Sequence, residues 1–178
     1  MEGDMPFQDA LGARLKLLEP SRRQIEDLLQ QHPHELTPGM REITDLLRSL
    51  GKQVFLVSGG FENMIAPVAE VLDVPMENVF ANRILFHDDD EGTYKGFDDS
   101  AFTSRAGGKA RAILHIKEAN DYRNGVVMVG DGGTDYEARR DGAADVFVGY
   151  GHIANRKVVR ENADLFIMHW DELASRLQ

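Results

Sequence analysis

The sequence has 178 residues but no cysteine, only one tryptophan, and fewer basic than acidic residues. Without cysteine there can be no disulfide bond, thiolate zinc site or cysteine nucleophile. The formal net charge of −10 disfavours a nucleic-acid surface and an anionic membrane as partners. No apolar run is long enough to cross a bilayer, and residues 1–4 do not resemble the start of a signal peptide. We therefore expect a cytoplasmic protein that binds neither nucleic acid nor membrane.

The residues that are present suit alternating strands and helices around one core. Hydrophobic residues make up 42% of the chain, which is enough for a sizeable core. Short apolar runs predict buried strands at 53–57, 125–130, 145–148 and 165–167, with helical segments between them. This alternation predicts an α/β fold, a three-layer Rossmann-like parallel sheet with helices on both faces.

The N-terminal segment does not follow this alternation. Residues 6–18 and the stretch from Pro20 read as two amphipathic helices with no strand between them, so we expect a small helical cap. His32 and His34 follow the second helix. They are interpreted as residues of a solvated loop rather than as a metal-binding pair. The predicted domains are a partial helical cap over 1–36 and a core over 37–178.

A β-hairpin is predicted inside the core, over residues 79–97. Its strands, 79–87 and 92–97, alternate in polarity on either side of the acidic run Asp88–Glu91. Four adjacent carboxylates could suggest a metal site. Charge runs of this kind are more often solvated, and that interpretation is preferred here.

The most informative stretch is Gly125–Ala138, in which an apolar run leads into a glycine-rich turn and then a helix. Asp131 follows the run directly, at the carboxyl end of a predicted parallel strand, where open α/β sheets bind ligands. Asp135 lies in the first turn of the next helix. Two neighbouring carboxylates favour a cation between them, and Mg²⁺ prefers such oxygen ligands. The alternative is an ordinary strand–helix turn with polar residues that face water.

Two other turns carry polar groups at helix starts. Ser58-Gly59-Gly60 follows the strand at 53–57, and its hydroxyl and amides could bind an oxyanion; a serine that caps the next helix is the alternative. Lys109 opens another helix and alone would be interpreted as a surface lysine. The stretch is not a Walker A loop, because Ala110 follows the lysine. Residues 130–135 are not a dinucleotide fingerprint, because the last position is aspartate.

Together the three turns supply what phosphoryl transfer requires: a hydroxyl with amides, one fixed positive charge, and carboxylates for a metal. In this order they resemble the haloacid dehalogenase superfamily and, within it, the phosphoserine phosphatases. The resemblance covers essentially the whole chain. It is carried by segments 54–61 (VFLVSGGF), 78–83 (NVFANR), 107–109 (GGK) and 129–135 (VGDGGTD), and by 6–15 (PFQDALGARL), which resembles the family's cap.

The resemblance implies magnesium-dependent hydrolysis of O-phosphoserine to serine and phosphate, the last step of serine biosynthesis, through an aspartyl phosphate. It implies that Asp131 binds Mg²⁺ and that Lys109 stabilises the nucleophile and the phosphoryl charge. Asp135 would position Lys109 or the water on the metal. The groups implied to contact the substrate are Ser58, Gly59, Gly60, Lys109 and Thr134 at the phosphate, with Phe7 and Arg14 of the cap at the amino acid.

One family motif is missing from these residues. The motif Asp-x-Asp-x-Thr, which supplies the nucleophile and the general acid, does not occur in the sequence. We therefore expect the central nucleophile strand to be missing, which would leave two strand edges open and favour self-association, for example as a homodimer, or binding of a partner strand. The alternative function is a catalytically inactive remnant that binds phosphate ligands or a partner chain.

Overall fold

The computed structural model describes residues 7–120, 122 and 125–178. The chain forms two compact units. The first takes in the chain up to Glu35 together with Phe55–Gly108, and the second takes in Leu36–Val54 together with Lys109–Gln178. The predicted boundary between a cap over 1–36 and a core over 37–178 does not coincide with this division of the chain. It separates the two parts by their expected roles, and it stays a prediction.

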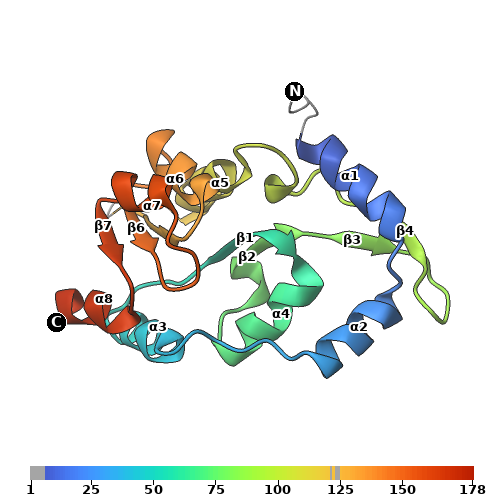
Figure 1. The fold of residues 1–178 in the computed structure, drawn as a ribbon, viewed down its shortest axis with the longest axis horizontal. Coiled ribbons are helices and arrows are strands. Elements are labelled where there is room, and N and C mark those ends of the chain that lie inside the picture. Colours follow the sequence, from blue (N-terminus) through green and yellow to red (C-terminus); the bar gives the residue numbers. More distant parts are fainter. Residues whose placement is uncertain (1–6, 121, 123–124) are drawn as a thin grey trace. The chain divides into compact units, whose positions relative to one another are not determined.

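The first unit is built on two parallel strands, β1 (Leu56–Phe61) and β2 (Val79–Asn82). Helix α4 (Glu62–Val71) connects them and packs against both (Figure 1). The predicted strand at 53–57 is displaced: the paired strand begins at Leu56 and continues through the serine-glycine turn. The turn residues therefore belong to β1 itself.

The first unit also holds a β-hairpin of β3 (Ile84–Phe86) and β4 (Tyr94–Phe97). The predicted hairpin strand over 79–87 is wrong in its first half, because residues 79–82 form β2 and pair with β1 instead. Residues 79–82 join the parallel pair because the largely apolar β2 packs against β1 and α4. Only the shorter β3 continues into the hairpin.

The two predicted N-terminal helices are confirmed as α1 (Phe7–Leu18) and α2 (Arg22–Gln31). Ser21 caps α2 by accepting a hydrogen bond from the amide of Gln24 at 3.1 Å. Helix α1 lies against β4, with so little space that a β-carbon on Gly12 would come within 3.1 Å of the ring of Phe97.

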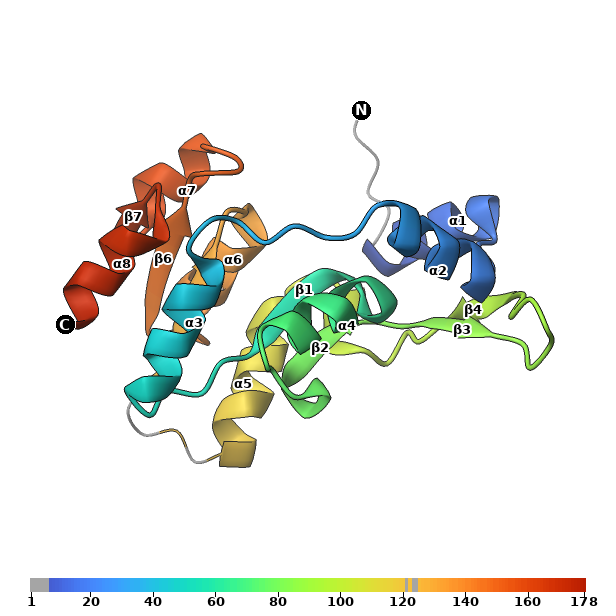
Figure 2. The same cartoon turned by 90° about the horizontal axis from the view of Figure 1, so that it is seen from below.

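The second unit has three layers (Figure 2). Its middle layer is a parallel sheet in the order β5 (Val127–Gly130), β6 (Val146–Tyr150), β7 (Leu165–Ile167). Successive residues of β6 face opposite sides, so that Phe147 and Val148 join different apolar clusters. The helices are α5 (Gly108–Asn120), α6 (Gly133–Arg140) and α7 (Lys157–Asn162) on the Phe147 side, and α3 (Met40–Ser49) and α8 (Trp170–Leu177) on the other.

The predicted α/β fold of parallel strands and helices is confirmed, but the strands form two parallel sheets rather than one. Among the described residues, β1 pairs in parallel only with β2, and β5 only with β6. The expectation that a central strand is missing between β1 and β5 stays a prediction. None of the helices in the described part of the chain combines the length and the apolar character that crossing a bilayer requires.

Candidate functional site

Lys109 and Asp135 form a nearly buried ion pair in the second unit. Lys109 is the second residue of α5, and Asp135 is the third residue of α6. The lysine Nζ lies 2.6 Å from Oδ1 of the aspartate, and the side chains are 19% and 4% exposed. A lysine held this way keeps a positive charge at a fixed place near the carboxyl end of β5. The two residues are thus in direct contact, while their predicted roles stay predictions.

Asp135 also has a backbone partner. Its Oδ2 accepts a hydrogen bond from the backbone amide of Gly132 at 3.0 Å. Gly130 has no side chain because a β-carbon there would collide with the carboxyl group of Asp135. The glycines of this turn therefore make room for a buried carboxylate that orients Lys109.

Asp131 is the carboxylate that remains accessible. It follows β5 directly, and its side chain is 40% exposed. Its nearest cation is Arg156, at 3.7 Å between Nη2 and Oδ2, and that guanidinium is 56% exposed. Thr134, in the first turn of α6, is also exposed. An open carboxylate at a strand end can hold a magnesium ion that keeps several waters.

The described residues offer a cation few side-chain ligands. They contain no group of three or more histidines, cysteines, aspartates or glutamates that could hold a metal ion. The acidic hairpin tip is not such a group: it is exposed, and Asp89 accepts hydrogen bonds from the amide and hydroxyl of Thr93. The Thr93 hydroxyl is the main cause that lowers the pKa of Asp89. His32 and His34 are exposed loop residues.

Ser58, Gly59 and Gly60 form a bulge within β1. The β1–β2 ladder pairs Val57 with Phe80 and then Phe61 with Asn82, so three residues of β1 stand opposite Ala81 alone. Ser58 does not cap α4, because Phe61 holds the N-cap position. Its Oγ accepts a hydrogen bond from the amide of Gly60 at 3.0 Å. The alternative of a simple capping serine is therefore wrong.

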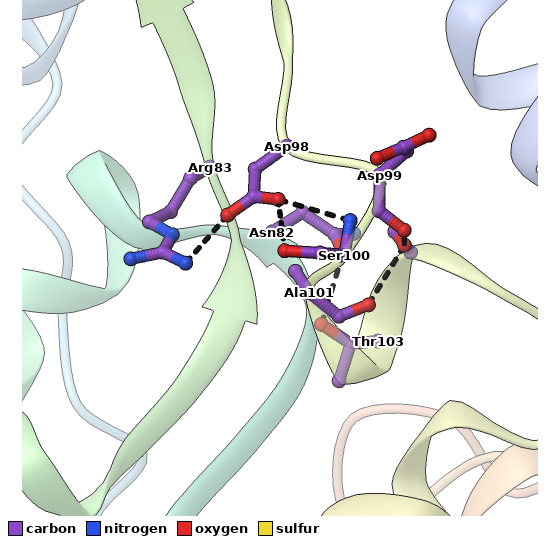
Figure 3. Close-up of polar contacts among 8 residues, drawn as sticks. Asn82, Arg83, Asp98, Asp99, Ser100, Ala101 and Thr103 are labelled. Atoms are coloured by element: carbon purple, nitrogen blue, oxygen red, sulfur yellow. Dashed lines mark hydrogen bonds and ion pairs between the residues drawn. The ribbon is translucent and has the colours of Figure 1, made fainter.

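Asn82, a fully buried residue at the end of β2, holds this bulge. Its Nδ2 donates to the carbonyl of Gly59 at 2.8 Å, and its Oδ1 accepts from the hydroxyl of Thr103 at 2.9 Å. Figure 3 shows Asn82 and Thr103 with the neighbouring Asp98–Ser100 turn. Sequence reasoning missed both residues. The available signal was an asparagine at the end of an apolar strand, where a buried amide needs a specific partner.

The cap residues Phe7 and Arg14 lie on α1 of the first unit and are both exposed, Phe7 by 44%. Seven residues apart, they share one face of the helix. A cavity of about 930 Å³ adjoins α1, but its lining includes Gly12 and Lys16 and neither of these two residues. None of the residues predicted to contact the substrate lines this cavity.

The predicted site residues thus divide between the units. Lys109, Asp131, Thr134 and Asp135 lie in the second unit, and the serine-glycine bulge and the cap residues lie in the first. That all of them gather around one substrate stays a prediction.

Comparison with known proteins gives a consistent result. The sequence profile of the haloacid dehalogenase-like hydrolases matches residues 4–140. The phosphoserine phosphatase of Rattus norvegicus is 43% identical over 178 residues, which is 100% of this chain and 77% of the rat protein. The chloroplastic phosphoserine phosphatase of Arabidopsis thaliana is 44% identical over 177 residues, which is 99% of this chain but 59% of the plant protein.

A solved structure supports the same family assignment. A phosphoserine phosphohydrolase-like protein from Francisella tularensis has a TM-score of 0.82 and 30% identity, covering 100% of this chain and 80% of that chain. The family profile covers most of this chain, and the rat relative is matched along all of it. This chain therefore belongs to the haloacid dehalogenase-like hydrolases and, among them, to the phosphoserine phosphatase family.

Proposed function

We propose that this chain supplies the phosphate-binding and metal-binding groups for magnesium-dependent hydrolysis of O-phosphoserine to serine and phosphate. The single observation that carries the proposal is the nearly buried Lys109–Asp135 pair beside the accessible Asp131. A fixed cation and an open carboxylate at the end of a parallel strand suit a transferring phosphoryl group.

Each residue has a role that follows from its contacts. The direct contact between Asp135 and Lys109 supports a role for Asp135 in orienting that lysine. Lys109 neutralises negative charge on the phosphoryl group. Asp131 holds Mg²⁺, which when bound supplies a further positive charge to the phosphoryl oxygens. Arg156 lies 3.7 Å from Asp131, so its guanidinium would compete with the cation for that carboxylate.

The serine-glycine bulge binds the phosphate group of the substrate. The Ser58 hydroxyl and the backbone amide of Gly59 donate hydrogen bonds to it, and Gly60 lies next to them. Thr134 lies exposed at the start of α6, where it can contact the substrate. At the amino-acid end, Arg14 binds the carboxylate through its planar guanidinium, and Phe7 packs against the substrate carbon chain. Exposure of both cap residues on one helix face supports this assignment.

The attacking aspartate must come from a segment outside these residues, because the motif Asp-x-Asp-x-Thr is absent from them. In the proposed reaction its carboxylate attacks phosphorus, the serine oxygen leaves with a proton from the second aspartate, and water then hydrolyses the aspartyl phosphate. The cytoplasmic location stays a prediction, since the Arabidopsis relative is chloroplastic by name.

The test measures phosphate release from O-phosphoserine with Mg²⁺, using this chain with and without an added segment that carries an Asp-x-Asp-x-Thr strand. We expect release only with the segment, and its loss in Lys109→Ala and Asp131→Asn. Lys157→Ala is the matched control, because its weak pair with Glu161 is exposed on α7. Full activity of Lys109→Ala in the complemented protein would contradict the assignment.

A second candidate is a non-catalytic protein that binds phosphate ligands or a partner chain. The absence of the nucleophile motif favours it specifically. The same assay separates the two: phosphate binding without turnover, even after the segment is added, supports the second candidate.

A further inference from the structure

Because of the bulge in β1, the peptide that joins Gly59 to Gly60 lies outside the regular pairing between β1 and β2. The Gly59 carbonyl and the Gly60 amide belong to the same planar peptide, so they point in opposite directions. Asn82 holds the carbonyl end through Nδ2 at 2.8 Å, and Ser58 Oγ holds the amide end at 3.0 Å. This peptide is therefore fixed at both ends.

The orientation of the Asn82 amide follows from its partners. A carbonyl oxygen can only accept, so the amino group of Asn82 must face Gly59 and its oxygen must face Thr103. The Thr103 hydroxyl then has to be the donor. Asn82 is 0% exposed and Thr103 is 4% exposed, so water does not compete for these bonds.

Thr103 is itself held by the turn that Figure 3 shows. It lies in the short 3-10 helix η2 (Phe102–Ser104), where the buried Ser104 donates through Oγ to the carbonyl of Ala101 at 2.7 Å. Asp98 receives hydrogen bonds from Ser100 and from Arg83, the neighbour of Asn82. The Ser100 hydroxyl is the main cause that lowers the pKa of Asp98. The chain neighbours of both Asn82 and Thr103 are thus held by hydrogen bonds.

The fixed peptide determines what the Ser58 hydroxyl can do. Because its oxygen accepts from Gly60, its hydrogen must point away from that amide and is available to a ligand. A β-carbon on Gly59 would meet no atom within 4 Å other than those of its chain neighbours, so there is open space beside the backbone at Gly59. A phosphoryl oxygen can approach the backbone there.

We propose that Asn82, supported by Thr103, is a positioning residue of the phosphate-binding bulge: it fixes the Gly59–Gly60 peptide and thereby directs the Ser58 hydroxyl to a phosphoryl oxygen. This inference rests on the proposed function, which assigns phosphate binding to the bulge. Asn82 contacts no reacting atom in this arrangement, because its side chain is fully buried and bonds to Gly59 and Thr103.

The test replaces Asn82 with aspartate and measures inorganic phosphate binding by equilibrium dialysis at pH 8.5 and pH 5. The ionised carboxylate accepts from Thr103 but cannot donate to Gly59, and a protonated one can. Relative to the wild type at the same pH, we expect Asn82→Asp to bind phosphate about 10-fold more weakly at the higher pH and within about twofold at the lower pH. Asn82→Ala is expected to stay weak at both.

Asn162→Asp is the matched control. The Nδ2 of Asn162 also donates to a backbone carbonyl, that of Val158 at 2.8 Å, but on exposed α7. We expect wild-type phosphate binding from this variant at both pH values. Circular dichroism at each pH verifies that the variants are folded.

If Asn82→Asp does not fold, Thr103→Val provides the same test without a buried charge. It removes only the hydroxyl that orients Asn82, so phosphate affinity should fall severalfold and Thr103→Ser should restore it. Wild-type phosphate binding by folded Asn82→Asp at pH 8.5, by folded Asn82→Ala or by folded Thr103→Val overturns the inference and leaves the proposed function intact. A wild type that binds no phosphate at either pH overturns the proposed function.

Discussion

At the scale of single residues, the glycines of the two turns serve different purposes. Gly130 is required by packing, because any β-carbon would collide with Asp135. Gly59 has no such neighbour within 4 Å, and its φ is not in the left-handed region. Among the described residues, no packing contact and no backbone angle requires a glycine at 59, and the proposed approach of a ligand to the backbone would favour one.

Gly59→Ala is expected to separate stability from binding. The added methyl group should change the free energy of unfolding by no more than about 0.5 kcal/mol, since it meets no protein atom. It occupies the space over the bulge, so affinity for inorganic phosphate should fall about 10-fold or more. Urea unfolding and equilibrium dialysis measure the two quantities. Unchanged phosphate affinity would contradict a phosphate site at this bulge.

Lys109→Ala is expected to destabilise the second unit. It leaves the Asp135 carboxylate, 4% exposed, without its counter-charge, and breaking a buried pair in this way costs about 3–5 kcal/mol. Lys157→Ala breaks an ion pair of 3.9 Å whose side chains are 79% and 54% exposed, so about 0.5 kcal/mol or less is expected there. Urea midpoints of the two variants test the contrast, and equal shifts would show that burial of the pair contributes nothing.

At the scale of helices and strands, Asp164 links three elements of the second unit. Its Oδ2 accepts from Nε of Arg139 on α6 at 2.9 Å and from the amide of Phe147 on β6 at 2.8 Å, just before β7 begins. The hydrogen bond from Arg139, followed by that from Phe147, lowers the pKa of Asp164 below its ordinary value.

This lowered pKa predicts an acid dependence of stability. A carboxyl group whose pKa is lower in the folded state stabilises the fold above its unfolded pKa, near about 4, and loses that contribution as the pH falls through the folded value. Asp164→Asn is neutral at every pH. The free energy of unfolding of the variant should therefore fall less steeply below about pH 4 than that of the wild type. Urea titrations at a series of pH values measure both slopes, and parallel curves would refute the link.

Sequence patterns located most elements but not the pairing between them. The apolar run at 165–167 predicts β7 with its observed bounds, because the run is short and sharply bounded. The strand predicted at 53–57 begins and ends earlier than the observed β1, because the glycines of a bulge look like a turn in the sequence. The positions of Asp131 after an apolar run and of Asp135 in the next helical turn make both of them candidates from the sequence. Lys109 alone reads as a surface lysine and is given a role only through the family resemblance. The partner of the buried Asn82 amide depends on the β1–β2 register, which the sequence pattern does not give.

At the scale of the whole molecule, four parallel strands have a neighbour on one side only among the described residues: β1, β2, β5 and β7. On β5, Val127 is 57% exposed. Unpaired strand edges that carry apolar side chains favour pairing with another chain. The net charge of −10 opposes association in general, so any that occurs has to come from specific surfaces.

We expect the chain to self-associate through these edges, and Val127→Lys to reduce that association. A lysine on an edge strand keeps its charge in water and disfavours a second strand beside it. Val158→Lys is the control, because it removes a comparably exposed valine, at 42%, from α7 without touching a strand edge. Sedimentation velocity over a range of concentrations measures the oligomer fraction. A wild type that stays monomeric at every concentration, or an equal effect of both lysines, would mean that the strand edges do not drive association.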